Sequence, residues 1–167
     1  MTTECLSPTS TYHITSNTDT TLSLTKEDLL DLFCAIGQGS GYWAEDVTFG
    51  NVELDKFGCY KDRGPDPKKW EWEYEGCAGW ALDFKPSDPI TLIDTETDKD
   101  LKCEIWDLIK AIKKILNKEI SLCDDIDGSF REAFISNKYP ENDMSYIDAE
   151  AADCILQVAL FGDVVYG

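Results

Sequence analysis

Three stretches of the chain repeat apolar residues at helical spacing. The first follows Thr25, whose hydroxyl can cap a helix, and it predicts a helix over 26–36 that ends at Gly37. The second predicts a helix over 104–118 with lysines on its solvent side, and the third predicts a helix over 148–161, which Asp148 caps and Gly162 ends. The apolar positions of the first two helices are Leu29, Leu30, Leu32, Phe33 and Ile36, then Ile105, Leu108, Ile109, Ile112, Ile115 and Leu116.

Two other stretches alternate in the manner of strands. Residues 69–75 place aromatic side chains on one face and glutamates on the other, and alternation resumes after Gly79, so residues 69–84 predict a hairpin. A second hairpin is predicted over 90–104, with its turn at 98–100. Residues 1–24 predict an irregular segment with a short strand at 12–14, and 119–143 reads as a polar stretch. The expected fold class is α+β: a single domain over 1–167 in which an antiparallel β-sheet is packed by about three α-helices.

Charge adds a strong constraint to this pattern. The 167 residues include 33 acidic and 15 basic side chains, which gives a formal net charge of −18. Half of that excess lies in residues 119–167, with eleven acidic and two basic residues. Binding to nucleic-acid phosphates depends on Lys and Arg, so we expect no direct contact with nucleic acid. Because 43% of the residues are hydrophobic, the chain should nevertheless fold rather than behave as an acidic tail.

The acidic residues form rows on the predicted strands. In an extended chain, side chains two residues apart share one face at intervals of about 6.6 Å. The ordinary interpretation is that such positions are the solvent faces of half-buried strands. The alternative is an imitation of the phosphate array of a nucleic acid, and the overall charge favours it because a basic partner would relieve the self-repulsion. The candidate partner-binding residues are Asp94, Glu96, Asp98 and Asp100, then Glu71, Glu73 and Glu75, then Asp124, Asp125 and Asp127 of an acidic turn.

Signs of catalysis are weak. His13 is the only histidine, so a Ser-His-Asp or Cys-His mechanism would depend on it, and a surface or strand histidine is the better interpretation. The glycines at 37–41 are followed by no Lys-Ser or Lys-Thr pair, so they do not form a phosphate loop. We therefore expect no enzyme and no cofactor.

Two kinds of metal site can be compared with the sequence, and only the zinc site remains an alternative. The acidic turn resembles the middle of a calcium loop, but the two end ligands would fall on Cys123 and Phe134, which do not suit calcium. The seven cysteines show no CxxC spacing and are expected to be reduced, mostly buried thiols. A zinc-binding structural module built on distant cysteines, for example Cys59 and Cys77 with two others, remains the alternative.

Location follows from the same absence of signals. The chain starts with no basic segment followed by an apolar run, and its apolar runs are far shorter than the roughly 18 residues of a membrane span. We expect a protein of the cytoplasm that contacts no membrane.

Several segments carry a resemblance. The run from Asp148 to Gly167, with Gly41-Tyr42-Trp43-Ala44 and the hairpin around Thr91-Leu92-Ile93-Asp94, resembles small proteins encoded by bacteriophages and integrative elements. The chain is also similar in type to the anti-CRISPR and other anti-defence proteins, which are often small, acidic and without catalytic motifs. This resemblance implies an inhibitor acting in the cytoplasm of a host bacterium. Its expected partner is a host defence protein with a basic groove, such as a CRISPR effector nuclease.

Overall fold

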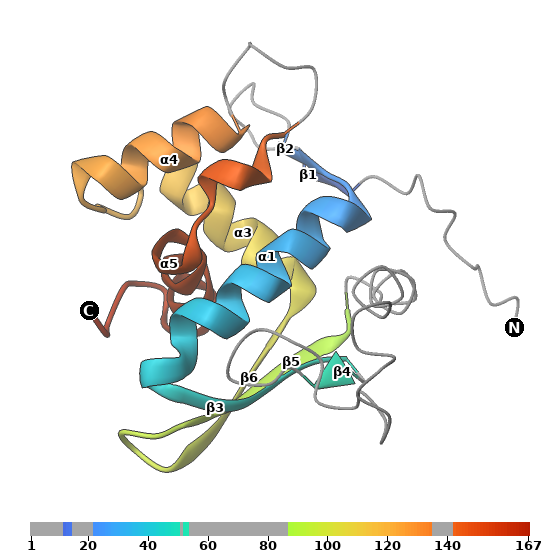
Figure 1. The fold of residues 1–167 in the computed structure, drawn as a ribbon, viewed down its shortest axis with the longest axis vertical. Helices are drawn as coiled ribbons and strands as arrows, with labels where there is room; N and C mark the ends of the chain where they lie inside the picture. The colour runs from blue at the N-terminus through green and yellow to red at the C-terminus, as the bar shows by residue number, and fades with distance from the viewer. Residues whose placement is uncertain (1–11, 15–21, 51, 54–86, 135–141) are drawn as a thin grey trace, which may run out of the picture.

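The structure is a computed structural model that describes residues 12–14, 22–50, 52–53, 87–134 and 142–167 (Figure 1). A four-stranded antiparallel sheet with the order β4-β3-β5-β6 lies beside the helices, and β1 pairs with β2 in a separate two-stranded sheet. The elements in chain order are β1 (Tyr12–Ile14), β2 (Leu22–Leu24), α1 (Lys26–Gly39), η1 (Ser40–Tyr42), β3 (Ala44–Phe49), β4 (Val52–Glu53), β5 (Pro89–Asp94), β6 (Lys99–Glu104), α3 (Ile105–Leu116), α4 (Asp124–Phe134), η3 (Met144–Tyr146) and α5 (Ala149–Phe161).

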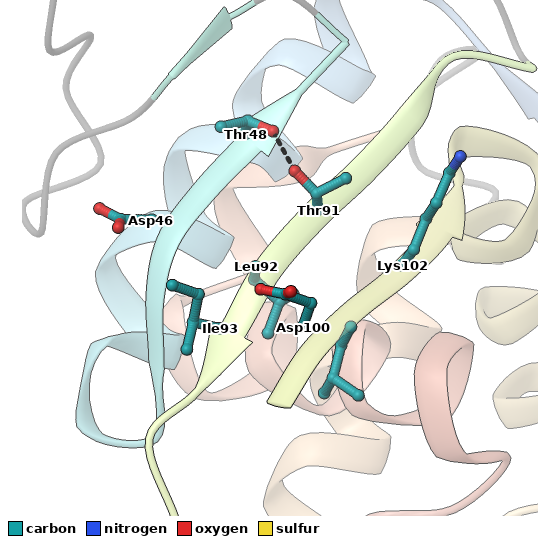
Figure 2. A pocket seen from close by; sticks show the side chains of 8 residues that line it. Asp46, Thr48, Thr91, Leu92, Ile93, Asp100 and Lys102 are labelled. Carbon is teal, nitrogen blue, oxygen red and sulfur yellow. Dashed lines mark hydrogen bonds between the residues drawn. The ribbon is translucent and has the colours of Figure 1, made fainter. Parts of the chain in front are cut away.

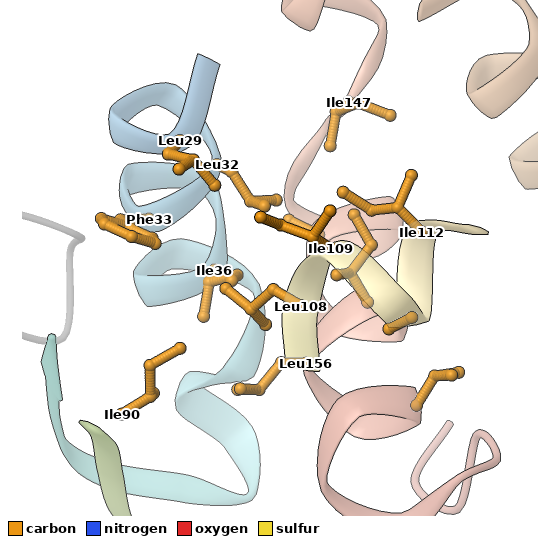
Figure 3. Packing of buried hydrophobic residues seen from close by; sticks show 14 of the residues in the cluster. Leu29, Leu32, Phe33, Ile36, Ile90, Leu108, Ile109, Ile112, Ile147 and Leu156 are labelled. Atoms are coloured by element: carbon orange, nitrogen blue, oxygen red, sulfur yellow. The ribbon is translucent and has the colours of Figure 1, made fainter. Parts of the chain in front are cut away.

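The core lies between the helices and one face of the four-stranded sheet. Alternate residues of β5 are buried, so Ile90 and Leu92 face the helices, and α5 packs against both α1 and α3. Figure 3 shows apolar side chains of α1, α3, α5 and β5 meeting in this space. Leu108 of α3 is completely buried there, and burying such a side chain contributes about 1.5–3 kcal/mol. The described residues thus form an α+β fold, as the pattern of the sequence predicted.

Helix α1 begins where predicted but runs further. Asp28 donates its backbone N–H to the Thr25 hydroxyl at 3.1 Å, and the Thr25 N–H donates to the Asp28 carboxylate at 2.9 Å. The helix continues through Gly37 to Gly39, so the predicted end at Gly37 was wrong. Tertiary contact overrides the weak helix propensity of glycine here, because a Cβ on Gly39 would lie 1.9 Å from the Ala149 carbonyl oxygen. Glycine allows α1 to approach the start of α5 this closely.

The other two predicted helices are confirmed as α3 and α5, with ends that differ by one or two residues. The Asp148 carboxylate accepts the Ala151 N–H at 2.9 Å and caps α5. Gly162 ends α5 with φ of 80°, a left-handed conformation that glycine adopts at little cost. Helix α3 follows β6 directly, and Asp107 in its first turn accepts the Glu104 N–H at 2.9 Å.

A helix absent from the prediction occupies part of the polar stretch. Helix α4 runs over Asp124–Phe134, where an acidic turn was expected, so that expectation was wrong. The three acidic residues of its first turn made this segment resemble a polar turn in the sequence. In the structure they favour the helix, because they interact with the positive end of the helix dipole. Ile126, Phe130 and Ala133 supply apolar positions at helical spacing, and Phe130 is completely buried.

The hairpin predicted over 90–104 is confirmed as β5 and β6, with a shifted turn. Asp94 pairs with Lys99, so the turn spans 95–98 rather than the predicted 98–100. Asp98 has φ of 53°, in the left-handed region that Asp and Asn tolerate better than most residues. The strand expected at 12–14 is β1. The hairpin predicted over 69–84 lies outside the described residues.

Candidate functional site

Asp94 is buried and does not belong to the predicted acidic row on the surface. Its side chain is 3% exposed, since it lies on the buried face of β5 with Ile90 and Leu92. The carboxylate accepts hydrogen bonds from the Thr97 hydroxyl at 2.7 Å, the Glu96 N–H at 2.9 Å and the Tyr166 hydroxyl at 2.9 Å. The Thr97 hydroxyl is the main reason that the pKa of Asp94 lies below its ordinary value. The prediction that Asp94 stands in a surface row was wrong, because the chain turns directly after it.

The other hairpin acids stay on the surface and gain neighbours from β3. Glu96 and Asp98 lie in the exposed turn, and Asp100 lies on β6. Register pairs Ile93 with both Glu45 and Asp100, so these two acids share the outer face of the sheet across three strands. Asp46 lies next to Glu45 at a bulge, with φ of 50°. We call these five exposed acids, Glu45, Asp46, Glu96, Asp98 and Asp100, the acidic sheet end.

A shallow groove continues this surface along the outer face of the sheet. Its volume is about 410 Å³, and Asp46 and Asp100 line one part of it while Lys102 lines another. Figure 2 shows the Thr48 and Thr91 hydroxyls facing each other across β3 and β5, 2.6 Å apart. Among the described residues that line it, the groove therefore contains two threonine hydroxyls, and its two acidic residues outnumber its single lysine.

The second predicted acidic group is separate from the first. Asp124, Asp125 and Asp127 occupy the first turn of α4, which lies far from the β5–β6 turn in Figure 1. Asp127 accepts hydrogen bonds from Lys118 and from Arg131 Nε, and the lysine is the main cause of its lowered pKa. Asp127 therefore has a structural role, because it links α4 to Lys118 and to Arg131 within the helix. Glu71, Glu73 and Glu75 lie outside the described residues.

A buried polar network joins η1, α5 and the C-terminal residues. Asp153 is 5% exposed; its Oδ1 accepts the Trp43 indole N–H at 2.8 Å, and its Oδ2 accepts from the Tyr42 hydroxyl at 2.9 Å. Burial raises the pKa of Asp153, and burial together with the bond to Asp153 raises the pKa of Tyr42 to about 12. Sequence reasoning missed this network, and its only signal was the presence of Asp153 and Gln157 inside the apolar segment 149–161.

Gln157 extends the network to the C-terminal segment. Its Nε2 donates to Asp153 Oδ2 at 2.7 Å and to the Tyr166 carbonyl oxygen at 2.9 Å. Its Oε1 accepts the backbone N–H groups of Val165 at 2.8 Å and Tyr166 at 2.6 Å. The Tyr166 ring then stacks on Trp43, with centroids 4.9 Å apart. The last residues are thereby tied to the core.

The described cysteines bring no metal ligands together. Cys103 and Cys154 are buried, as expected, and burial raises their pKa values to about 12 and about 11, whereas Cys123 is exposed. No group of three or more His, Cys, Asp or Glu side chains suited to a metal occurs among the described residues. Cys5, Cys59 and Cys77 lie outside them, so the zinc alternative stays an untested hypothesis.

Comparison of the chain with protein-family models, with curated proteins and with solved structures gives no match. Within the described ranges, no helix has both the length and the apolar character needed to cross a bilayer. The assignment of a function therefore depends on the chemistry of these surfaces.

Proposed function

We propose that this protein is a non-enzymatic inhibitor from a phage or mobile element, which acts in the cytoplasm of a host bacterium. It binds the basic groove of a nucleic-acid-handling defence protein and blocks nucleic-acid binding, with the RNA-guided nuclease of a CRISPR system as its target. The acidic sheet end carries this proposal. Its acids lie on a β-hairpin turn and on paired strands, and Glu96, Asp98 and Asp100 form no ion pair within the described part of the chain.

The electrostatics of the whole chain support the same conclusion. A net charge of −18 on 167 residues disfavours the compact state through self-repulsion, and a cationic partner relieves that cost. Strands hold their side chains at regular spacing, with neighbouring strands about 4.8 Å apart, so Glu45 and Asp100 are separated by roughly 10 Å across the sheet. A groove that accommodates phosphates would meet a comparable anionic array here. Electrostatic steering would make association fast and sensitive to salt.

The test compares two triple variants with the same change in charge. Glu96→Gln/Asp98→Asn/Asp100→Asn neutralises three acids of the acidic sheet end, and Asn suits the positive φ at position 98. The control Glu119→Gln/Asp124→Asn/Asp125→Asn neutralises three exposed acids near α4, two of which belong to the second predicted acidic group, so the pair of variants decides between the two acidic surfaces. Each protein is used to capture partners from host lysate at low and high salt, and the captured nuclease is then assayed for DNA cleavage.

We expect the first triple to weaken capture and inhibition by about tenfold, because it removes the steering charges, and the control to change them less than threefold. Circular dichroism checks that both variants fold. Equal weakening by the two triples would show that net charge alone matters, and full inhibition by the first would reject this surface. Failure of the unaltered protein to capture a nucleic-acid-handling protein would reject the function itself.

A further inference from the structure

A cleft of about 560 Å³ opens beside the buried network, and Tyr166, which lines it, also bonds to Asp94 at the start of the β5–β6 turn. It lies between η1, the first half of α5, the segment before α4 and the C-terminal segment, and we call it the C-terminal cleft. Its walls are mainly apolar and aromatic. The residues that matter here are Tyr42, Leu122, Ile126, Glu150, Asp153 and Val164.

The charges around the C-terminal cleft all have one sign. Glu150 and Asp153 line it, and no lysine or arginine is among the described residues that do. Glu150 is exposed, whereas Asp153 is 5% exposed and forms part of the inner wall. Its carboxylate accepts three hydrogen bonds, from Trp43, Tyr42 and Gln157, of about four that a carboxylate can accept. The negative charge of Glu150 also raises the pKa of Asp153, in addition to the larger effect of burial.

We propose that the C-terminal cleft binds a guanidinium group, the arginine side chain of the basic protein partner. The idea rests on the function proposed above and gives the partner a second contact point. The guanidinium would lie between the Glu150 and Asp153 carboxylates, where it reduces their mutual repulsion. Its aliphatic stem would pack on Leu122, Ile126 and Val164.

Arginine suits this cleft better than lysine. A guanidinium is planar and more weakly hydrated than an ammonium group, so it loses less when it enters a partly apolar space. It also stacks on aromatic rings, and Tyr42 exposes 58% of its surface although its hydroxyl is bonded to Asp153. The other acidic surface, by contrast, lacks aromatic walls among the residues that line its groove.

The test uses this chain and two small probes of the same shape, one cationic and one neutral. N-acetylarginine amide and its neutral isostere N-acetylcitrulline amide are titrated against the protein and followed by backbone amide NMR shifts. We expect the arginine probe to bind in the millimolar range and shift amides around Tyr42, Glu150 and Asp153, and the citrulline probe to shift none of them. Glu150→Gln should weaken binding about threefold, since exposed ion pairs are modest, and Glu119→Gln outside the cleft should not change it.

Several results would contradict the guanidinium site or one of its parts. Equal shifts from the two probes, no shifts from either, or an unchanged affinity in Glu150→Gln overturns the guanidinium site. If Nα-acetyl-lysine amide, which keeps its side-chain ammonium group, binds as tightly as the arginine probe, the choice of arginine is overturned. Because these titrations involve no partner, they are independent of the proposed function. In the lysate capture, a Tyr42→Ala/Glu150→Gln variant that retains the partner fully overturns the partner contact.

Discussion

Gln157 ties helix α5 to the C-terminal segment, and its replacement by leucine measures how much that connection stabilises the fold. The side chain is completely buried and makes four short hydrogen bonds, one to Asp153 and three to the backbone of Val165 and Tyr166. Leucine has a similar volume but neither donates nor accepts. Gln157→Leu therefore removes the bonds without opening a large cavity.

The expected loss can be estimated from these contacts. A typical hydrogen bond contributes about 1 kcal/mol net, so the loss of four bonds corresponds to about 4 kcal/mol. Two effects reduce this cost: the leucine gains apolar burial, and the C-terminal segment can detach and hydrate its freed backbone groups. We expect the free energy of unfolding to fall by about 2 kcal/mol, which corresponds to about 4–8 °C in Tm for a chain of this size.

Two measurements check the estimate. Urea denaturation followed by circular dichroism gives the loss of stability, and hydrogen exchange reports on the Val165 and Tyr166 amides, which should become unprotected in Gln157→Leu. Deletion of residues 165–167 should cost a similar amount, and the combined variant should lose less than the sum. Continued protection of the two amides in Gln157→Leu, or strict additivity, would show that Gln157 does not hold this segment.

Three further substitutions test local features of the fold. Gly39→Ala should lower the stability of the fold by more than about 2 kcal/mol in thermal unfolding, because the new Cβ meets the Ala149 carbonyl. The control Gly128→Ala in α4, where nothing lies within 4 Å of the new Cβ, should raise stability by about 0.5–1 kcal/mol. Equal effects of the two substitutions would refute the close approach of α1 and α5. Thr97→Val should raise the pKa of Asp94, measured by NMR titration of its carboxyl group. Because the pKa of Asp94 is depressed in the folded protein, its stabilising contribution is present above about pH 4 and is lost as the pH falls through the folded value. Thr97→Val should therefore lose less stability than the unaltered protein on acidification. An unchanged Asp94 titration in the variant would contradict this.

The acidic surface was only partly predictable from the sequence. Alternation along 90–104 predicted the hairpin, and Glu96, Asp98 and Asp100 are exposed as expected. The position of Asp94 depended on where the turn begins, and that is set by the Thr97 and Tyr166 hydroxyls that bond to its carboxylate. Glu45 joined the surface through strand pairing between residues far apart in the chain, which a local pattern does not contain.

The sequence by itself determined the α+β class, three of the helices, the caps of two of them, the hairpin and the anionic character, because periodicity, capping and charge are properties of neighbouring residues. Tertiary structure alone decided which polar residues became buried. Asp153 and Gln157 lie four positions apart on an apolar helix and bond to each other, but their other hydrogen-bond partners, such as Trp43 and Tyr166, come from other parts of the chain. A buried polar group is tolerated where such partners converge, and that convergence depends on contacts between residues more than a hundred positions apart.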